Sequence, residues 1–132
     1  MTLSARKFAA SLAALALLTL PAFAGGSSIS PAGIWQSTTG ESRYQVSLCG
    51  DGTELCAKLT WLRADARTKE NLLYLNTYVV KGAQAMQANR WRGTVNYNGD
   101  TVSGSVTLVD ADTLKLTGCK GFFCKALEFT RV

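Results

Sequence analysis

Four cysteines are the residues of this chain with the widest range of chemistry: Cys49, Cys56, Cys119 and Cys124. Such a set can hold a zinc ion, act as redox-active pairs, or form two disulfides. Neither short spacing is the Cys-x-x-Cys of a redox-active pair, which favours a structural role. On composition alone, three disulfide pairings remain open.

Catalysis and metal binding have few candidates among the remaining residues. The chain contains no histidine, which excludes a Ser-His-Asp triad, a Cys-His dyad and a histidine-ligated metal. Carboxylates in turns commonly accept local backbone hydrogen bonds, and nothing resembles the Asp-x-Asp-x-Asp-Gly pattern of a calcium loop. We therefore predict no enzyme activity, no cofactor and no metal. The carboxylates considered are Asp51, Glu54, Asp100, Asp110 and Asp112.

Residues 1–24 have the pattern of a secretory signal peptide. Arg6 and Lys7 precede an apolar run from Phe8 to Leu20, and a small-residue cleavage site ends at Ala24. The run of 13 residues is shorter than the roughly 20 that cross a membrane, so we expect no membrane span in the mature chain. Export to the periplasm or beyond favours disulfides over zinc.

The mature chain reads as one globular domain of modest charge. Residues 25–32 are expected to be a flexible segment and residues 33–132 a single β domain. With 47% hydrophobic residues, a core is expected. Removal of Arg6 and Lys7 lowers the formal charge from +5 to +3, which is too mild to indicate nucleic-acid binding.

Period-two alternation and closely spaced turn signals predict consecutive antiparallel strands. The strongest signal is Asn98-Gly99, a typical two-residue hairpin loop. Its register pairs Val95 with Val102, Gly93 with Gly104, and Trp91 with Val106.

Counting outward from other turn residues in the same way predicts four further hairpins. A Thr39-Gly40 loop pairs Trp35 with Tyr44, and a loop at Gly52-Thr53 pairs Val46 with Leu59 and Tyr44 with Trp61. A loop at 110–112 pairs Val106 with Leu116, and a loop at Gly121-Phe122 pairs Leu116 with Leu127 and Leu114 with Phe129.

One more strand is predicted at 73–80, with Leu73, Leu75 and Val79 facing inward. Polar connections at 63–71 and 81–89 flank it, the first containing a helical turn. The total is about eight strands. Uniformly short connections favour an up-and-down barrel over a sandwich, and polar outward positions favour surroundings of water over lipid. The predicted fold class is all-β, a small antiparallel up-and-down barrel.

The alternation of inward and outward positions along the strands then selects among the three possible disulfide pairings. Cys49 and Cys56 fall opposite one another on the outward face, and so do Cys119 and Cys124. We therefore predict two local disulfides, Cys49 with Cys56 and Cys119 with Cys124.

The two ends of this barrel differ in character. Trp35, Trp91 and Arg131 meet at one end, where a guanidinium over an indole indicates a closed, packed base. The opposite end has the features of a mouth. We expect its ligand-binding residues to be Tyr44, Trp61, Tyr97, Phe122, Phe123 and Lys125.

Three inward glycines, Gly93, Gly104 and Gly118, lie side by side on adjacent strands near the predicted mouth. They either let the sheet bend for closure or leave space as a cavity wall, and both roles are compatible.

The pair Gly33-x-Trp35 and Arg131 resembles the signature of lipocalins and other calycin-type barrels. A wider set resembles a bacterial family of exported, lipocalin-like domains of unknown function, over nearly the whole mature chain. The resemblance implies a small β-barrel, a periplasmic or secreted location, Trp35 and Arg131 as the base, and the cysteines as staples. It implies no agreed activity and no binding residues. The wider set is Cys49-Gly50, Leu55-Cys56, Trp61-Leu62, Trp91-Arg92-Gly93, Gly118-Cys119 and Phe129-Thr130-Arg131-Val132.

We expect a binding protein for a small hydrophobic or amphipathic ligand. In this hypothesis the ligand enters past Phe122 and Phe123, and Tyr97 or Lys125 fixes a polar or acidic group. The alternatives are a periplasmic protein-binding module, such as an enzyme inhibitor acting through segment 25–32, and a packed structural or envelope-stress protein.

Overall fold

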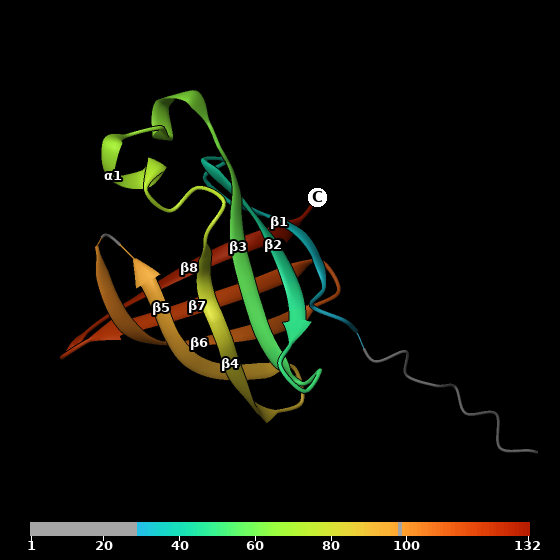
Figure 1. The fold of residues 1–132 in the computed structure, drawn as a ribbon. Coiled ribbons are helices and arrows are strands. Elements are labelled where there is room, and N and C mark those ends of the chain that lie inside the picture. Colours follow the sequence, from blue (N-terminus) through green and yellow to red (C-terminus); the bar gives the residue numbers. More distant parts are fainter. Residues whose placement is uncertain (1–28, 98) are drawn as a thin grey trace, which may run out of the picture.

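A computed structural model describes residues 29–97 and 99–132, so the predicted signal peptide lies outside the described residues. The chain forms a closed barrel in which eight antiparallel strands pair in sequence order and β8 returns to β1, as Figure 1 shows. The predicted fold class is confirmed. The strands are β1 (Gly33–Ser37), β2 (Ser42–Cys49), β3 (Glu54–Leu62), β4 (Tyr78–Gln87), β5 (Arg90–Tyr97), β6 (Asp100–Asp110), β7 (Thr113–Lys120) and β8 (Phe123–Arg131).

Four of the five predicted hairpin registers are confirmed. In β5 and β6, Val95 faces Val102 and Trp91 faces Val106. The pairs of β1 with β2, β6 with β7 and β7 with β8 also follow prediction. Alternation of apolar and polar residues fixes these registers because a slip of one residue would turn every core side chain toward water.

The register of the β2–β3 hairpin was predicted wrongly. Val46 faces Ala57 instead of Leu59, because the turn closes over residues 50–53 and Cys49 faces Glu54. Gly50 and Gly52 adopt positive φ in this turn, and the Asp51 carboxylate accepts a hydrogen bond from the backbone N–H of Thr53. The centre of the hairpin therefore lies one residue earlier in the sequence than a two-residue Gly52-Thr53 loop would place it.

Both disulfide pairings are confirmed. Cys119 lies directly opposite Cys124, as predicted. Because of the shifted register, Cys49 and Cys56 are diagonal neighbours, with Ser47 opposite Cys56 and 6.0 Å between the two cysteine Cα atoms. Two disulfides indicate an oxidising, exported location for the protein.

A β-bulge in β3 overturns the predicted position of Trp61. The pairing jumps from Arg43 with Trp61 to Tyr44 with Leu59, so Thr60 is an extra residue in β3. The extra residue reverses the alternation. Leu62 is therefore buried, whereas Trp61 is 37% exposed and lies under the guanidinium of Arg43, 4.7 Å from the ring centroid. Trp61 faces away from the barrel interior.

The strand predicted at 73–80 was also misplaced, because β4 starts only at Tyr78 and continues through the segment expected to be a polar connection. Thr68 caps a short helix, α1 (Lys69–Leu72), by accepting a hydrogen bond from the backbone N–H of Asn71. Turns continue to Asn76, which has positive φ. Leu73 is exposed as a result, whereas Val79 is partly buried as expected.

A helical turn within 63–71 was predicted correctly. Residues Ala64–Ala66 form a short 3-10 helix, η1, and α1 follows it. Within the described residues, no helix is long and apolar enough to span a membrane.

Candidate functional site

Antiparallel order assigns every turn to one of two barrel ends. The β2–β3, β4–β5 and β6–β7 turns lie at one end, together with the start of β1 and the end of β8. We call this end the base. The β1–β2, β5–β6 and β7–β8 turns and the helical connection 63–77 lie at the other end, which we call the mouth.

At the base, Arg131 covers Trp35. The guanidinium carbon lies 4.4 Å from the ring centroid of Trp35, which is fully buried. The indole N–H of Trp35 donates to the carbonyl of Pro31 at 2.8 Å. Arg131 donates to three backbone carbonyls, those of Ser30, Ala32 and Ala111, each at 2.8 Å. These contacts close the base and connect the end of β8 to the segment before β1 and to the β6–β7 turn.

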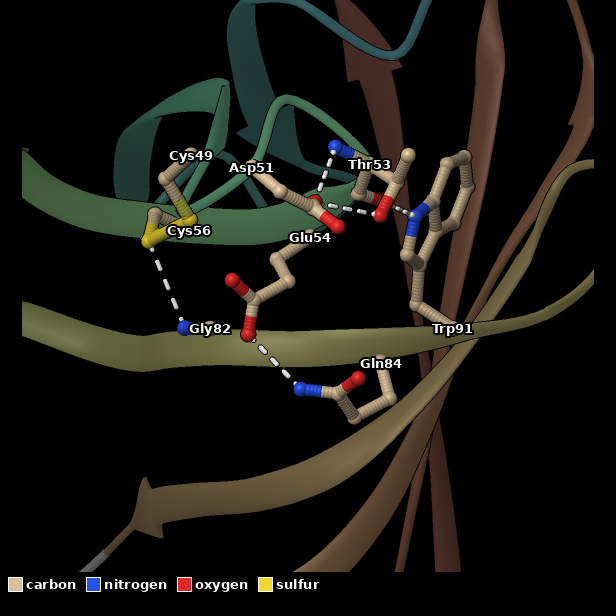
Figure 2. Close-up of a disulfide and its surroundings, with 8 residues drawn as sticks. All are labelled: Cys49, Asp51, Thr53, Glu54, Cys56, Gly82, Gln84 and Trp91. Atoms are coloured by element: carbon tan, nitrogen blue, oxygen red, sulfur yellow. Dashed lines mark hydrogen bonds between the residues drawn. A yellow bond between two sulfur atoms is a disulfide. The ribbon is translucent and has the colours of Figure 1, made fainter.

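Trp91 lies at the same end, packed under the β2–β3 turn. Its indole N–H donates to the carbonyl of Thr53 at 2.9 Å, as Figure 2 shows. Beside it, the amide of Gln84 donates to Glu54 at 2.7 Å, and the backbone N–H of Gly82 donates to the Cys56 sulfur. The first disulfide thus belongs to the base.

The segment before β1 is attached to this base where it is described. Carbonyls of residues 30–32 accept hydrogen bonds from Trp35 and Arg131, which gives these residues a fixed course. The rest of the segment predicted to be flexible, residues 25–28, lies outside the described residues.

Two concave surfaces open at the mouth, and a small cavity lies between them and the base. The inner cavity has a volume of about 60 Å³. One concavity, about 290 Å³, follows the inner side of β6, β7 and β8, and the other, about 440 Å³, lies between β1, β8 and the helical connection. Leu127 borders all three spaces; the inner cavity and the smaller concavity are mostly apolar, whereas the larger concavity has a mixed polar and apolar lining.

Tyr44 and Lys125 occupy the predicted region of the mouth. Tyr44 borders the inner cavity and the larger concavity, and its ring meets Phe129 edge to face at 5.4 Å. Lys125 is exposed and borders both concavities. Tyr97 ends β5 opposite Asp100, and its side chain lies outside the described part of the structure.

Phe122 and Phe123 do not fold over the mouth. Both are exposed at the tip of the β7–β8 hairpin, and only Phe123 borders a concavity. Neither covers the barrel interior in this structure.

The three predicted glycines do lie side by side, since Gly93 faces Gly104 and Gly104 faces Gly118. A Cβ on Gly104 would lie 2.8 Å from the Val95 side chain, and one on Gly93 would lie 3.1 Å from the Ala83 backbone. At these two positions neighbouring atoms therefore fill the space that a side chain would take. Gly118 alone of the three borders the 290 Å³ concavity.

Several residues of the mouth were missed by sequence reasoning. Tyr74 and Asn71 from the helical connection border the larger concavity, and the Asn71 amide donates to the carbonyl of Ala66 at 2.8 Å. Leu116 and Leu127 border the smaller concavity, and their inward-facing positions on the predicted hairpin could have identified them as lining residues. The contribution of the connection was hidden because the segment was assigned to a strand.

The carboxyl groups with shifted pKa values lie where the chain changes direction: Asp51 in the β2–β3 turn, Asp65 in η1 and Asp110 at the end of β6. The hydroxyl and backbone N–H of Thr53 lower the pKa of the Asp51 carboxyl, and Arg63 lowers that of Asp65 through a hydrogen-bonded ion pair. The backbone N–H of Asp112, followed by the Thr113 hydroxyl, lowers the pKa of Asp110. In the described part of the chain, no three His, Cys, Asp or Glu residues gather as a metal site would need.

Fold and site together define a small β-barrel protein with a closed base, a mouth with one mostly apolar and one mixed concavity, and one disulfide at each end. A family model described as "Uncharacterized protein conserved in bacteria (DUF2147)" matches residues 33–131, the barrel from its first strand to its last. The chain therefore belongs to this bacterial family. No curated protein and no solved structure matches it significantly.

Proposed function

We propose that this protein is an exported binding module whose barrel mouth takes a small amphipathic molecule with an acidic group. The observation that carries the proposal is the lining of the mouth. Concavities of about 290 and 440 Å³ share two lining residues, the apolar Leu127 and the basic Lys125. Ligand sites typically span roughly 300–1,000 Å³ and combine an apolar lining with few polar anchors.

The ligand in this proposal lies at the mouth and not at the barrel centre. An inner cavity of about 60 Å³ is far smaller than the roughly 300–1,000 Å³ of typical ligand sites, so it is too small for such a ligand. The apolar part of the ligand would contact Leu116, Leu127 and Val102, which line the smaller concavity. A carboxylate or phosphate would bind Lys125 through charge-assisted hydrogen bonds.

The proposal also includes a lipocalin-like type of barrel and a cellular location. Trp35 under Arg131, after Gly33, supports the lipocalin-like type. In this proposal the signal peptide is removed after Ala24, and the mature chain works in the periplasm or outside the cell. The proposal assigns no catalytic step, cofactor or metal to the chain.

The first test measures displacement of the dye 1-anilinonaphthalene-8-sulfonate from the mature protein by dodecanoate. K125E places a negative charge at the mouth and should weaken dodecanoate binding on the order of tenfold. The matched control is K115E, because Lys115 is exposed on β7 opposite Glu128, outside the residues that border the mouth. Equal affinities of both variants would contradict the role of Lys125.

A second variant tests the concavity without changing charge. A Cβ on Gly118 would meet Val102 at 3.4 Å, an ordinary contact, so G118L should fold and fill the 290 Å³ concavity. We expect an unchanged melting temperature and loss of dodecanoate binding. Absence of dodecanoate binding by the wild type, together with a bare mass of envelope-purified protein in native mass spectrometry, would overturn the proposed function.

A further inference from the structure

Two phenylalanines at the tip of the β7–β8 hairpin are exposed far more than the fold requires. Phe122 is 103% exposed and Phe123 is 85% exposed, whereas Phe129 in the same hairpin is buried. Figure 1 shows this hairpin extending past the neighbouring strands. Large apolar side chains exposed together on a projecting element mark an interaction surface.

A disulfide constrains the hairpin that carries the two phenylalanines. Cys119 and Cys124 lie directly opposite one another and are joined by a disulfide immediately below the turn. The turn itself is short, with Gly121 at positive φ and Phe122 beside it. A rigid presentation of apolar groups lowers the entropy cost of docking.

Positive charge flanks the aromatic pair. Lys120 and Lys125 stand on either side of the tip, and both are exposed. The Lys120 ammonium lies 2.6 Å from an Asp100 carboxylate oxygen, an exposed pair that leaves its solvent side open to other anions. At the same end of the barrel, Leu73 is 74% exposed on the helical connection.

We propose that the hairpin tip docks the mouth of the barrel onto an anionic phospholipid bilayer. Phe122 and Phe123 would enter the boundary between headgroups and acyl chains, and the flanking lysines would contact lipid phosphates. The proposal stands apart from the ligand proposed for the mouth, because it requires no occupied concavity.

The size and charge of the tip favour a lipid surface over a second copy of the chain. Strand β8 pairs with β1 only at residues 129–131, so its edge nearer the tip is open, and the size and charge of the tip decide between the two partners. A standard protein interface buries about 800 Å² on each partner, more than a two-residue tip offers. Two tips placed together would also bring Lys120 and Lys125 of both copies into close repulsion.

The test is sedimentation of the mature protein with vesicles of phosphatidylglycerol and phosphatidylcholine, compared with phosphatidylcholine alone. We expect binding to the anionic vesicles that weakens with added salt. F122S/F123S should lower the partition coefficient on the order of tenfold or more. The matched control is V109S, because Val109 is 56% exposed near the base end of β6, and this variant should bind like the wild type.

A tryptophan probe separates docking from a general folding defect. In F122W the new indole should shift its emission to the blue on anionic vesicles and be quenched by brominated lipid. Equal binding of F122S/F123S and V109S, or emission of F122W unchanged by vesicles, would overturn the proposal. Concentration-dependent dimers lost in F122S/F123S, without vesicle binding, would overturn it in favour of self-association.

Discussion

Arg131 joins the last strand to the segment before the first strand, and this makes it the side chain whose loss should weaken the base most. Its guanidinium covers Trp35 and donates to the carbonyls of Ser30, Ala32 and Ala111. We predict that R131A lowers the free energy of unfolding by about 2–4 kcal/mol, because a stacked cation and several charge-assisted hydrogen bonds are lost together. Urea unfolding of the mature protein measures the change.

R131K tests whether geometry or charge carries this effect. Lysine keeps the charge but loses the planar fork that reaches three carbonyls, so we expect it to recover less than half of the loss. R92A, at an exposed position on the outer side of β5, is the control and should change stability by less than about 0.5 kcal/mol. A similar loss in R131A and R92A would show that the base does not depend on Arg131.

Trp61 illustrates why single positions escape sequence reasoning. Its predicted inward direction followed from parity with Leu59, and the parity changed because one residue, Thr60, is extra in β3. The Thr60 hydroxyl donates to the carbonyl of Arg43, a contact made across strands and not along the chain. Bulges depend on such long-range contacts, so local alternation gave no signal for this one.

Among the turns, Asp110 should make the stability of the β6–β7 hairpin depend on pH. Hydrogen bonds from the backbone N–H of Asp112 and then from Thr113 lower its pKa in the folded protein below the ordinary value of 3.8. The unfolded chain therefore binds the proton first as pH falls. The stabilisation is present above about pH 4 and is lost as pH falls through the lower, folded pKa.

We predict that D110N shows a smaller loss of stability between pH 6 and pH 2.5 than the wild type. Urea unfolding at both pH values checks this, with D112N as the control because it keeps the turn length and the Asp110 carboxylate. An unchanged pH dependence in D110N would contradict the role of the turn.

The two disulfides staple different hairpins at opposite ends of the barrel, so their contributions should add. Cys49–Cys56 closes a loop beside the base, and Cys119–Cys124 closes one at the tip. In the chain-entropy model, loops of this size contribute on the order of 2 kcal/mol each. We expect C49S/C56S and C119S/C124S each to lose about that much, and the quadruple variant to lose the sum within about 0.5 kcal/mol. Calorimetry and urea unfolding measure the losses, and a clearly larger combined loss would mean that the two hairpins are coupled.

Strand β4 shows the limit of hydrophobic patterning for a whole element. Its buried inner residues include Val80 and Ala83, and the strand continues through Lys81, Gln84 and Gln87, which are exposed. Small inward residues and polar outward ones made the strand pattern of β4 weak. The leucines that precede β4 showed a stronger strand pattern, yet they lie in a short helix and the turns after it, because Thr68 caps a helix there.

For the molecule as a whole, the closed barrel, the total of about eight strands and both disulfide pairings followed from the sequence, because alternation and turn residues act locally along each hairpin, whereas the place of β4 did not. Trp35 meeting Arg131 also followed, since closure brings the first and last strands together. The wall that residues 63–77 add to the mouth did not follow. A connection that packs across the end of a barrel is positioned by the completed fold, as Tyr74 beside the larger concavity shows.

This connection should open more readily than the barrel. Helix α1 has four residues, none of them buried, and short helices are marginal without packing. Strands β6 and β7 are hydrogen-bonded on both sides. We predict that amides of residues 69–75 exchange with deuterium at least a hundredfold faster than those of β6, because local opening there exposes little core.

T68A tests whether this opening is local. The Thr68 hydroxyl accepts the N-terminal hydrogen bond of α1 from Asn71, and loss of such a cap costs about 1 kcal/mol. We expect about fivefold faster exchange at 69–75, with exchange in β6 and urea unfolding of the barrel nearly unchanged. Equal acceleration in β6 would show instead that the connection unfolds only with the barrel. If the opening is local, the 440 Å³ concavity has one movable wall, and the mouth admits molecules of different size without any strand leaving its partners.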